Sequence, residues 1–135
     1  EEFHTRIKNI LKNRDVLIAP LEDRIKKTRE KIKGHLQDII GTEKIDENRF
    51  EQELIYYIEK LDFSEEIQRL HSNCEMFLEE LNGPAQGRKL GFISQEIGRE
   101  INTIGSKAND SIMQRIVVDM KDELEKIKEQ INNVL

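Results

Sequence analysis

Two glutamates, Glu96 and Glu100, stand four positions apart in a stretch with helical periodicity. Side chains at positions i and i+4 lie one turn apart on one face of a helix. Two such carboxylates can share a divalent cation, Mg²⁺ or Mn²⁺, or move protons, while the flanking cations Lys89 and Lys107 can neutralise a phosphate. We therefore take Glu96, Glu100 and Arg99 as catalytic candidates for phosphodiester cleavage, with the two glutamates as metal ligands. The same spacing also occurs in ordinary surface ion pairs, so spacing alone leaves both interpretations open.

Residues 88–107 carry more kinds of polar side chain than packing of a helix requires. Their apolar residues recur at spacings of three and four, as in the buried stripe of an amphipathic helix. This stripe consists of Leu90, Ile93, Ile97, Ile101 and Ile104. The other positions form two polar faces, one with Arg88, Gln95, Arg99, Asn102 and Ser106, the other with Lys89, Glu96, Glu100, Thr103 and Lys107. Phe92 falls on the polar side, where it can stack on a base or contact another subunit.

The net charge restricts where a nucleic acid can bind. The 135 residues carry a formal net charge of −5, so attraction to RNA requires a local basic patch. Residues 24–33 hold six basic residues and one acidic residue, a pattern that also describes a solvated helix face. Residues 88–107 hold four basic residues beside the two glutamates and form the second candidate patch.

Composition favours long helices over a large core. Charged residues make up 36% of the chain and aromatic residues 5%, with no Trp, a balance typical of helices with narrow apolar seams. No alternating apolar pattern predicts a strand, and no apolar run reaches the roughly 18 residues that cross a bilayer. We expect an all-α fold, an elongated bundle of long antiparallel helices with coiled-coil-like seams, in a cytoplasmic protein. The single cysteine, Cys74, lies in an apolar series and is expected to be buried and unreactive.

Residues 1–64 are expected to form a long helical hairpin. Apolar periodicity predicts helices over about 2–40, with a kink near Pro20, and about 46–62, with Asp46 as N-cap. A slip in the apolar repeat then predicts a joint at Asp62, with Glu65 completing a capping box.

Residues 65–135 are expected to form a second helical domain. Residues 82–87 read as a loop and residues 105–109 as a turn, after which Asp110 is either the N-cap of the last helix or a third carboxylate. The last helix carries an apolar residue alternately every four and three positions from Met113 to Val134, which indicates a coiled-coil-like seam. A second, split seam runs from Phe50 to Leu81. Since a thin chain cannot cover this much apolar stripe from both sides, we expect a homo-oligomer.

Residues 65–135 resemble the C-terminal domain of the YicC/YloC family of bacterial endoribonucleases. The resemblance rests on EEIQRL, GRKL-F, QE, RE-NT-GSK and EKIKEQINNV, and the helices before residue 65 match in pattern only. Members of the family have a separate N-terminal domain, which is absent here, and the chain starts without a methionine, so we expect a C-terminal fragment. The resemblance implies an endoribonuclease that cleaves single-stranded or loop RNA with a divalent cation, and ring assembly, with a hexamer expected for the intact protein.

The chain departs from the family pattern at several positions. Gly91 and Gly98 stand where relatives usually have Asp and Asn, and Asn73 stands where they have a histidine. His71 falls about 200° away from position 73 on a helix, so it is a poor replacement for a histidine acid or base. Gly91, Gly98 and Gly105 share a narrow sector, which favours close approach of a neighbouring helix.

Together with the resemblance, the second basic patch leads us to assign RNA binding to one set of residues in the polar helix. This set is Arg88, Lys89, Gln95, Asn102 and Lys107. The alternative is a noncatalytic helical module for oligomerisation and RNA clamping, whose cleaving groups lie partly in the N-terminal domain. A pure coiled-coil scaffold would explain the seams but leaves the polar faces of residues 88–107 without a role.

Overall fold

The computed structural model describes residues 2–40, 47–84, 87–108 and 110–134. Five helices make up nearly all of these residues: α1 (Glu2–Ile40), α2 (Glu47–Leu61), α3 (Ser64–Asn82), α4 (Gly87–Lys107) and α5 (Ser111–Val134). No strand occurs among the described residues, so the prediction of an all-α fold is confirmed.

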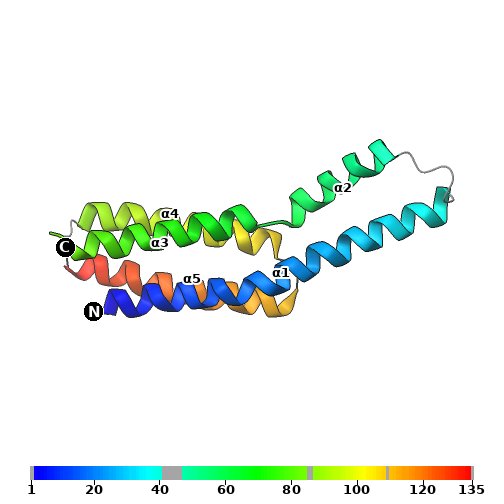
Figure 1. The fold of residues 1–135 in the computed structure, drawn as a ribbon. Coiled ribbons are helices and arrows are strands. Elements are labelled where there is room, and N and C mark those ends of the chain that lie inside the picture. Colours follow the sequence, from blue (N-terminus) through cyan, green and yellow to red (C-terminus); the bar gives the residue numbers. More distant parts are fainter. Residues whose placement is uncertain (1, 41–46, 85–86, 109, 135) are drawn as a thin grey trace.

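The first half of α1 packs with α3, α4 and α5 into a four-helix bundle whose neighbouring helices run antiparallel (Figure 1). α1 lies beside α5 and α3, and α4 lies beside α3 and α5. The second half of α1 continues past the bundle and pairs with α2 as a two-helix arm (Figure 1). The bundle therefore takes helices from both sides of the boundary that the sequence suggested between residues 64 and 65.

The core of the bundle consists of one apolar stripe from each helix. All five residues of the predicted stripe on α4 are buried, and they meet stripes from α1, α3 and α5. At the end opposite the arm, the rings of Phe3 and Phe77 pack edge to face with their centroids 5.6 Å apart. Cys74 is fully buried, which confirms its predicted burial, and this burial raises the pKa of its thiol to about 12.

Two arginines in the first half of α1 tie this long helix to the rest of the bundle. Arg6 pairs with Glu123 of α5 at 3.2 Å, and Arg14 Nε donates to the backbone carbonyl of Ile67 in α3 at 3.0 Å. Pro20 lies inside α1, which continues through it unbroken because the buried residues on either side of it stay on one face.

The predictions for the helix ends are confirmed in part. Asp110 caps α5, since its Oδ1 accepts the backbone N–H of Met113 at 2.7 Å, and the N-cap interpretation is confirmed. The predicted break near Asp62 is present, but the capping box is wrong, because Glu65 pairs with Arg69 instead. The turn predicted at 105–109 is also wrong at its start, since α4 continues to Lys107. The predicted Asp46 cap lies outside the described residues.

The seam on α5 is covered inside the chain. Its residues from Met113 to Ile131 are buried against α1 and α4, so no second subunit is needed to cover them. The expectation that other subunits complete this seam is therefore wrong. The physical reason is that α1, which is distant from α5 in the sequence, packs along α5 in the fold. The periodicity of α5 alone cannot reveal this contact.

Two glycines of α4 allow the close approach to α5 that the sequence suggested. A Cβ atom on Gly98 would lie 3.0 Å from Cδ2 of Leu124, and one on Gly105 would lie 3.1 Å from Cγ1 of Val117. A Cβ atom on Gly91 would have no atom within 4 Å outside its own helix, so close packing does not explain this third glycine. Among the described residues, no helix is long and apolar enough to cross a membrane.

We predict that Leu124→Lys unfolds the chain, because Leu124 is 3% exposed and an ammonium group there would be buried without an anion. Val118→Lys, at a position of α5 that is 51% exposed, is the matched control and should melt like the wild type by circular dichroism. A folded Leu124→Lys protein of lower mass by light scattering would instead place this seam between subunits.

We also predict that Gly91→Ala raises the free energy of unfolding by about 0.5–1 kcal/mol, since alanine is the better helix former and its methyl group meets no neighbour. Gly98→Ala should gain less or lose stability, because its methyl group presses on Leu124. Urea denaturation of both variants measures the difference, and equal stabilisation would contradict the close contact.

Candidate functional site

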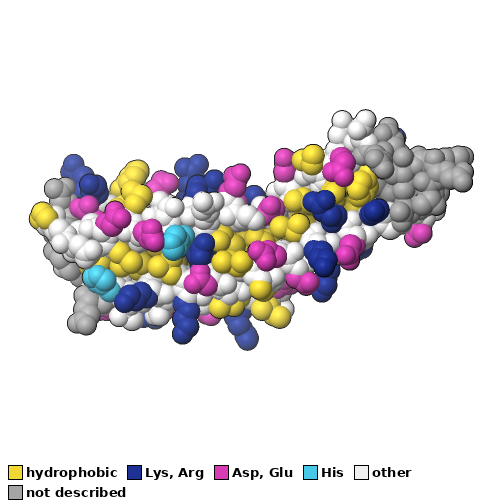
Figure 2. Space-filling model, in the orientation of Figure 1, with side chains coloured by type: hydrophobic (Ala, Val, Ile, Leu, Met, Phe, Trp, Pro, Cys, Tyr) yellow, Lys and Arg dark blue, Asp and Glu magenta, His cyan; other side chains and the backbone are white. Residues whose placement is uncertain are grey.

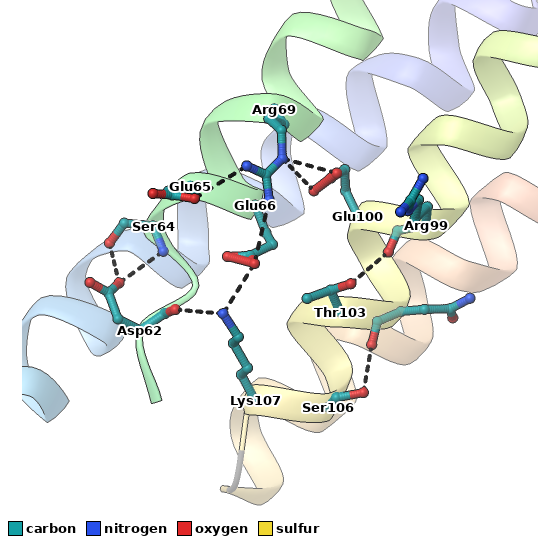
Figure 3. Close-up of polar contacts among 11 residues, drawn as sticks. Asp62, Ser64, Glu65, Glu66, Arg69, Arg99, Glu100, Thr103, Ser106 and Lys107 are labelled. Atoms are coloured by element: carbon teal, nitrogen blue, oxygen red, sulfur yellow. Dashed lines mark hydrogen bonds and ion pairs between the residues drawn. The ribbon is translucent and has the colours of Figure 1, made fainter. Parts of the chain in front are cut away.

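Four charged side chains form a connected group where α3 borders α4, and two of them are buried carboxylates (Figure 3). Glu100 of α4 is 7% exposed and Glu66 of α3 is 5% exposed. Arg69 Nε donates to the two carboxylate oxygens of Glu100 at 3.1 and 3.2 Å, and Arg69 Nη2 lies 3.6 Å from Glu66. These contacts hold the pKa of Arg69 above its ordinary value, chiefly through the hydrogen bonds to Glu100.

Lys107 completes this group at the last turn of α4. Its Nζ donates to the Glu66 carboxylate at 3.2 Å and to the backbone carbonyl of Asp62 at 3.1 Å (Figure 3). Arg24 of α1 donates to the carbonyl of Lys107 at 2.9 Å, where the helix leaves that carbonyl without a partner. The end of α4 is thereby tied to the joint between α2 and α3 and to the base of the arm.

The structure gives the two catalytic glutamates different surroundings. Glu100 is buried and paired with Arg69, whereas Glu96 is half-buried and makes no side-chain hydrogen bond or ion pair within the described part of the chain. The pair therefore offers one carboxylate held in place and one available carboxylate, a turn apart along the border with α3.

The predicted RNA-binding residues divide into two groups. Lys89 lies 3.5 Å from Glu80 of α3, and Lys107 is engaged as described, so both lysines face α3. Arg88, Gln95 and Asn102 make no side-chain hydrogen bond or ion pair to the described residues, and the same holds for Arg99. The side chains still available for a ligand are thus those on the outward part of α4.

Glu66 and Arg69 are the site residues that the sequence reasoning did not select. EEIQRL contributes to the family resemblance, and the three-residue spacing of Glu66 and Arg69 is that of a helical ion pair. That spacing could have marked the two residues as neighbours. It could not show that they meet Glu100 and Lys107, because those contacts depend on how α3 and α4 are aligned.

The departure at position 73 is not compensated by the nearby histidine. His71 faces α1, where it lines a groove with Arg14 and Glu22, and its Nε2 lies 2.9 Å from Glu75. This places His71 away from the border with α4, as the helical geometry predicted.

The donor set limits what kind of metal site is feasible. Among the described residues, no three His, Cys, Asp or Glu side chains are grouped so as to hold a metal ion. Glu96 and Glu100 alone fit a hard cation that keeps waters and takes phosphate oxygens as its other ligands, as Mg²⁺ usually does. A closed, protein-only metal site of the kind that binds structural zinc does not fit these residues.

Comparison with known proteins agrees with the resemblance. The family described as "Endoribonuclease YicC-like, C-terminal" matches residues 18–135. A protein of Clostridioides difficile named "Probable endoribonuclease YicC" is 41% identical over 108 residues, which are 78% of this chain and 37% of that protein. A protein of the same name from Haemophilus influenzae is 37% identical over 91 residues, 67% of this chain and 32% of that protein. The chain spans about a third of the length of these relatives.

We predict that Lys107→Met lowers the free energy of unfolding by about 1–3 kcal/mol, because the buried Glu66 carboxylate and the Asp62 carbonyl both lose a donor. Arg99→Met is the matched control, since its guanidinium has no such contact, and it should change stability by less than about 0.5 kcal/mol. Urea denaturation measures both values. Equal effects would mean that the Lys107 contacts do not hold the fold.

Proposed function

We propose, from the premise that the chain belongs to the family of YicC-like endoribonucleases, that it binds RNA on the outward side of α4 and takes part in cleaving single-stranded or loop RNA. The proposal rests on three residues that lie close together on α4. Glu100 is buried and held by Arg69, whereas Glu96 and Arg99 have no such contacts in the described structure. Packing of the bundle uses Glu100 but gives no role to the other two.

The chemistry follows from what each side chain can do. Arg99 is exposed and can bind a phosphodiester and neutralise the charge that develops on it during cleavage. No cationic side chain of the described chain pairs with Glu96, so its carboxylate is available either to hold a cation or to accept a proton. Arg69 orients Glu100 through both carboxylate oxygens, so that this carboxylate stays on the α3 side of the site.

A divalent cation, Mg²⁺ or Mn²⁺, is part of the proposal. Glu96 and Glu100 would hold it together with the phosphate of the RNA. When bound, such a cation supplies charge stabilisation at the phosphate and lowers the pKa of a bound water. Arg69 already donates to both carboxylate oxygens of Glu100, so a cation held by Glu100 would share these oxygens with Arg69.

A noncatalytic RNA clamp is the second candidate. It is favoured by the internal neutralisation of Glu66 and Glu100, because a buried carboxylate paired with a cation is what a structural ion pair requires. In that case the cleaving groups lie partly in another domain of the protein. The two candidates differ in whether removing a carboxylate slows cleavage while leaving RNA binding intact.

We further propose a homo-oligomer, with a hexamer for the intact protein, on the strength of the resemblance. Because α1 and α4 cover the α5 seam, contacts between subunits would have to use other apolar surface. The arm offers such surface, since Ile55, Tyr56 and Tyr57 on α2 are about half exposed.

We predict that Glu96→Gln and Glu100→Gln each slow RNA cleavage by at least about tenfold, the effect of losing one transition-state contact of about 1.4 kcal/mol. EDTA should abolish cleavage in the wild type. Glu79→Gln, at an exposed glutamate on α3, is the matched control and should cleave at the wild-type rate.

Binding of the same labelled RNA in EDTA separates the candidates. RNA binding in EDTA together with no cleavage when Mg²⁺ or Mn²⁺ is supplied would favour the clamp. Wild-type cleavage rates in folded Glu96→Gln and Glu100→Gln would remove both carboxylates from the catalytic assignment. Circular dichroism of each variant checks the fold, which matters most for the buried Glu100.

A further inference from the structure

One stripe of α4 faces outward along the whole length of the helix and contains no acidic residue. Its members recur at spacings of four and three and fall within a sector of about 80°: Arg88, Phe92, Gln95, Arg99, Asn102 and Ser106. We refer to these six residues as the outer stripe. It spans about 27 Å at 1.5 Å per residue.

The packing of α4 defines the direction of the outer stripe. On one side of it, Glu100 and Lys107 contact α3, and on the other side Gly98 and Gly105 lie against α5. The stripe lies between these two borders, so it points away from the bundle.

The polar members of the outer stripe are not used within the described chain. The side chains of Arg88, Gln95, Arg99 and Asn102 make no hydrogen bond or ion pair to the residues that the structure describes. Ser106 donates only to the Asn102 carbonyl, one turn earlier in the same helix. Two cations and two amides on one exposed line therefore remain available for a ligand.

Phe92 is the apolar member of this line and is 63% exposed. Arg88 precedes it by one turn and Arg99 follows it by two turns, so the ring lies between two free guanidinium groups. Along the upper edge of the molecule, above α3 and α4, Figure 2 shows basic groups and a hydrophobic projection, with acidic side chains among them.

From this arrangement we infer that Phe92 is a base-stacking subsite, which makes the outer stripe a track for an unpaired RNA strand. The inference rests on the proposed RNA-binding function and adds the position where a base is bound. Arg88 and Arg99 contact phosphates on either side, Phe92 stacks on one base, and the amides of Gln95 and Asn102 reach base edges. A base can stack on the ring only if it is unpaired, so the subsite selects single strands over duplexes.

Negative charge combined with flat apolar surface points to RNA as the occupant of Phe92. The chain carries a formal net charge of −5, whereas the outer stripe carries two cations and no acid. A ligand that covers Arg88, Phe92 and Arg99 together must supply both negative charge and flat apolar surface. A single-stranded nucleic acid supplies these two features in alternation along its length.

The test uses Phe92→Leu, which removes the ring but keeps an apolar side chain, and Phe92→Tyr, which keeps the ring. The probe is a short oligouridylate with one 2-aminopurine, compared with the same strand paired to its complement, in EDTA so that cleavage does not intervene. Ile112→Ala is the matched control, because Ile112 is 70% exposed on another helix.

We expect Phe92→Leu to weaken binding of the single strand by about 5-fold to 150-fold, the range for loss of one base–aromatic stack, and to abolish the quenching of 2-aminopurine. Phe92→Tyr and Ile112→Ala should bind like the wild type, and duplex binding should not change in any variant.

Three results would overturn the inference. Wild-type affinity and quenching in Phe92→Leu would exclude stacking. Equal weakening of single strand and duplex would show a role in general affinity. A Phe92→Leu protein that keeps its RNA affinity but has a lower mass by light scattering would place Phe92 in a contact between copies of the chain. If the wild type binds neither probe, the proposed RNA-binding function fails as well.

Discussion

The rotation of α4 about its own axis is the constraint on which the candidate site depends. Five apolar side chains on one side must enter the core, and the contacts of Gly98 and Gly105 with α5 allow little freedom to turn. Once these are in place, Glu100 and Lys107 can only face α3, and the outer stripe can only face solvent. Burial on one side of the helix thus determines which polar groups remain for a ligand on the other.

The α3–α4 border shows how buried charge restricts function. Glu66 and Glu100 lose most of their contact with water, and such carboxylates are tolerated when cations and hydrogen bonds compensate them. Arg69 and Lys107 provide this compensation, which removes Lys107 from the set of cations free to meet a phosphate. Arg88 and Arg99 keep that freedom because α4 presents them away from α3. Charges that hold the fold and charges that suit RNA are thereby separated on one helix.

The arm and the bundle are connected through the same region. Lys107 bonds to the Asp62 carbonyl in the joint that leads to α2, and Arg24, at the base of the arm, bonds to the Lys107 carbonyl. Both contacts lie at the end of α4 where the candidate site ends. A ligand that competes for Lys107 would therefore act on the contacts that position the arm, which gives the long α1 a structural connection to the proposed RNA surface.

Sequence periodicity by itself determined the five helices, the buried stripe of α4, the outward position of Phe92 and the buried Cys74. These features depend on residues within a few turns of one helix, where side-chain direction follows from 100° per residue. Only the tertiary structure decided that Arg69 and Glu66 meet Glu100 and Lys107, that α1 covers the α5 seam, and that Lys89 and Lys107 are engaged while Arg88 and Arg99 are free. Each of these depends on the alignment of helices that are distant in the chain, and a periodic pattern carries no information on which residue of a neighbouring helix stands opposite.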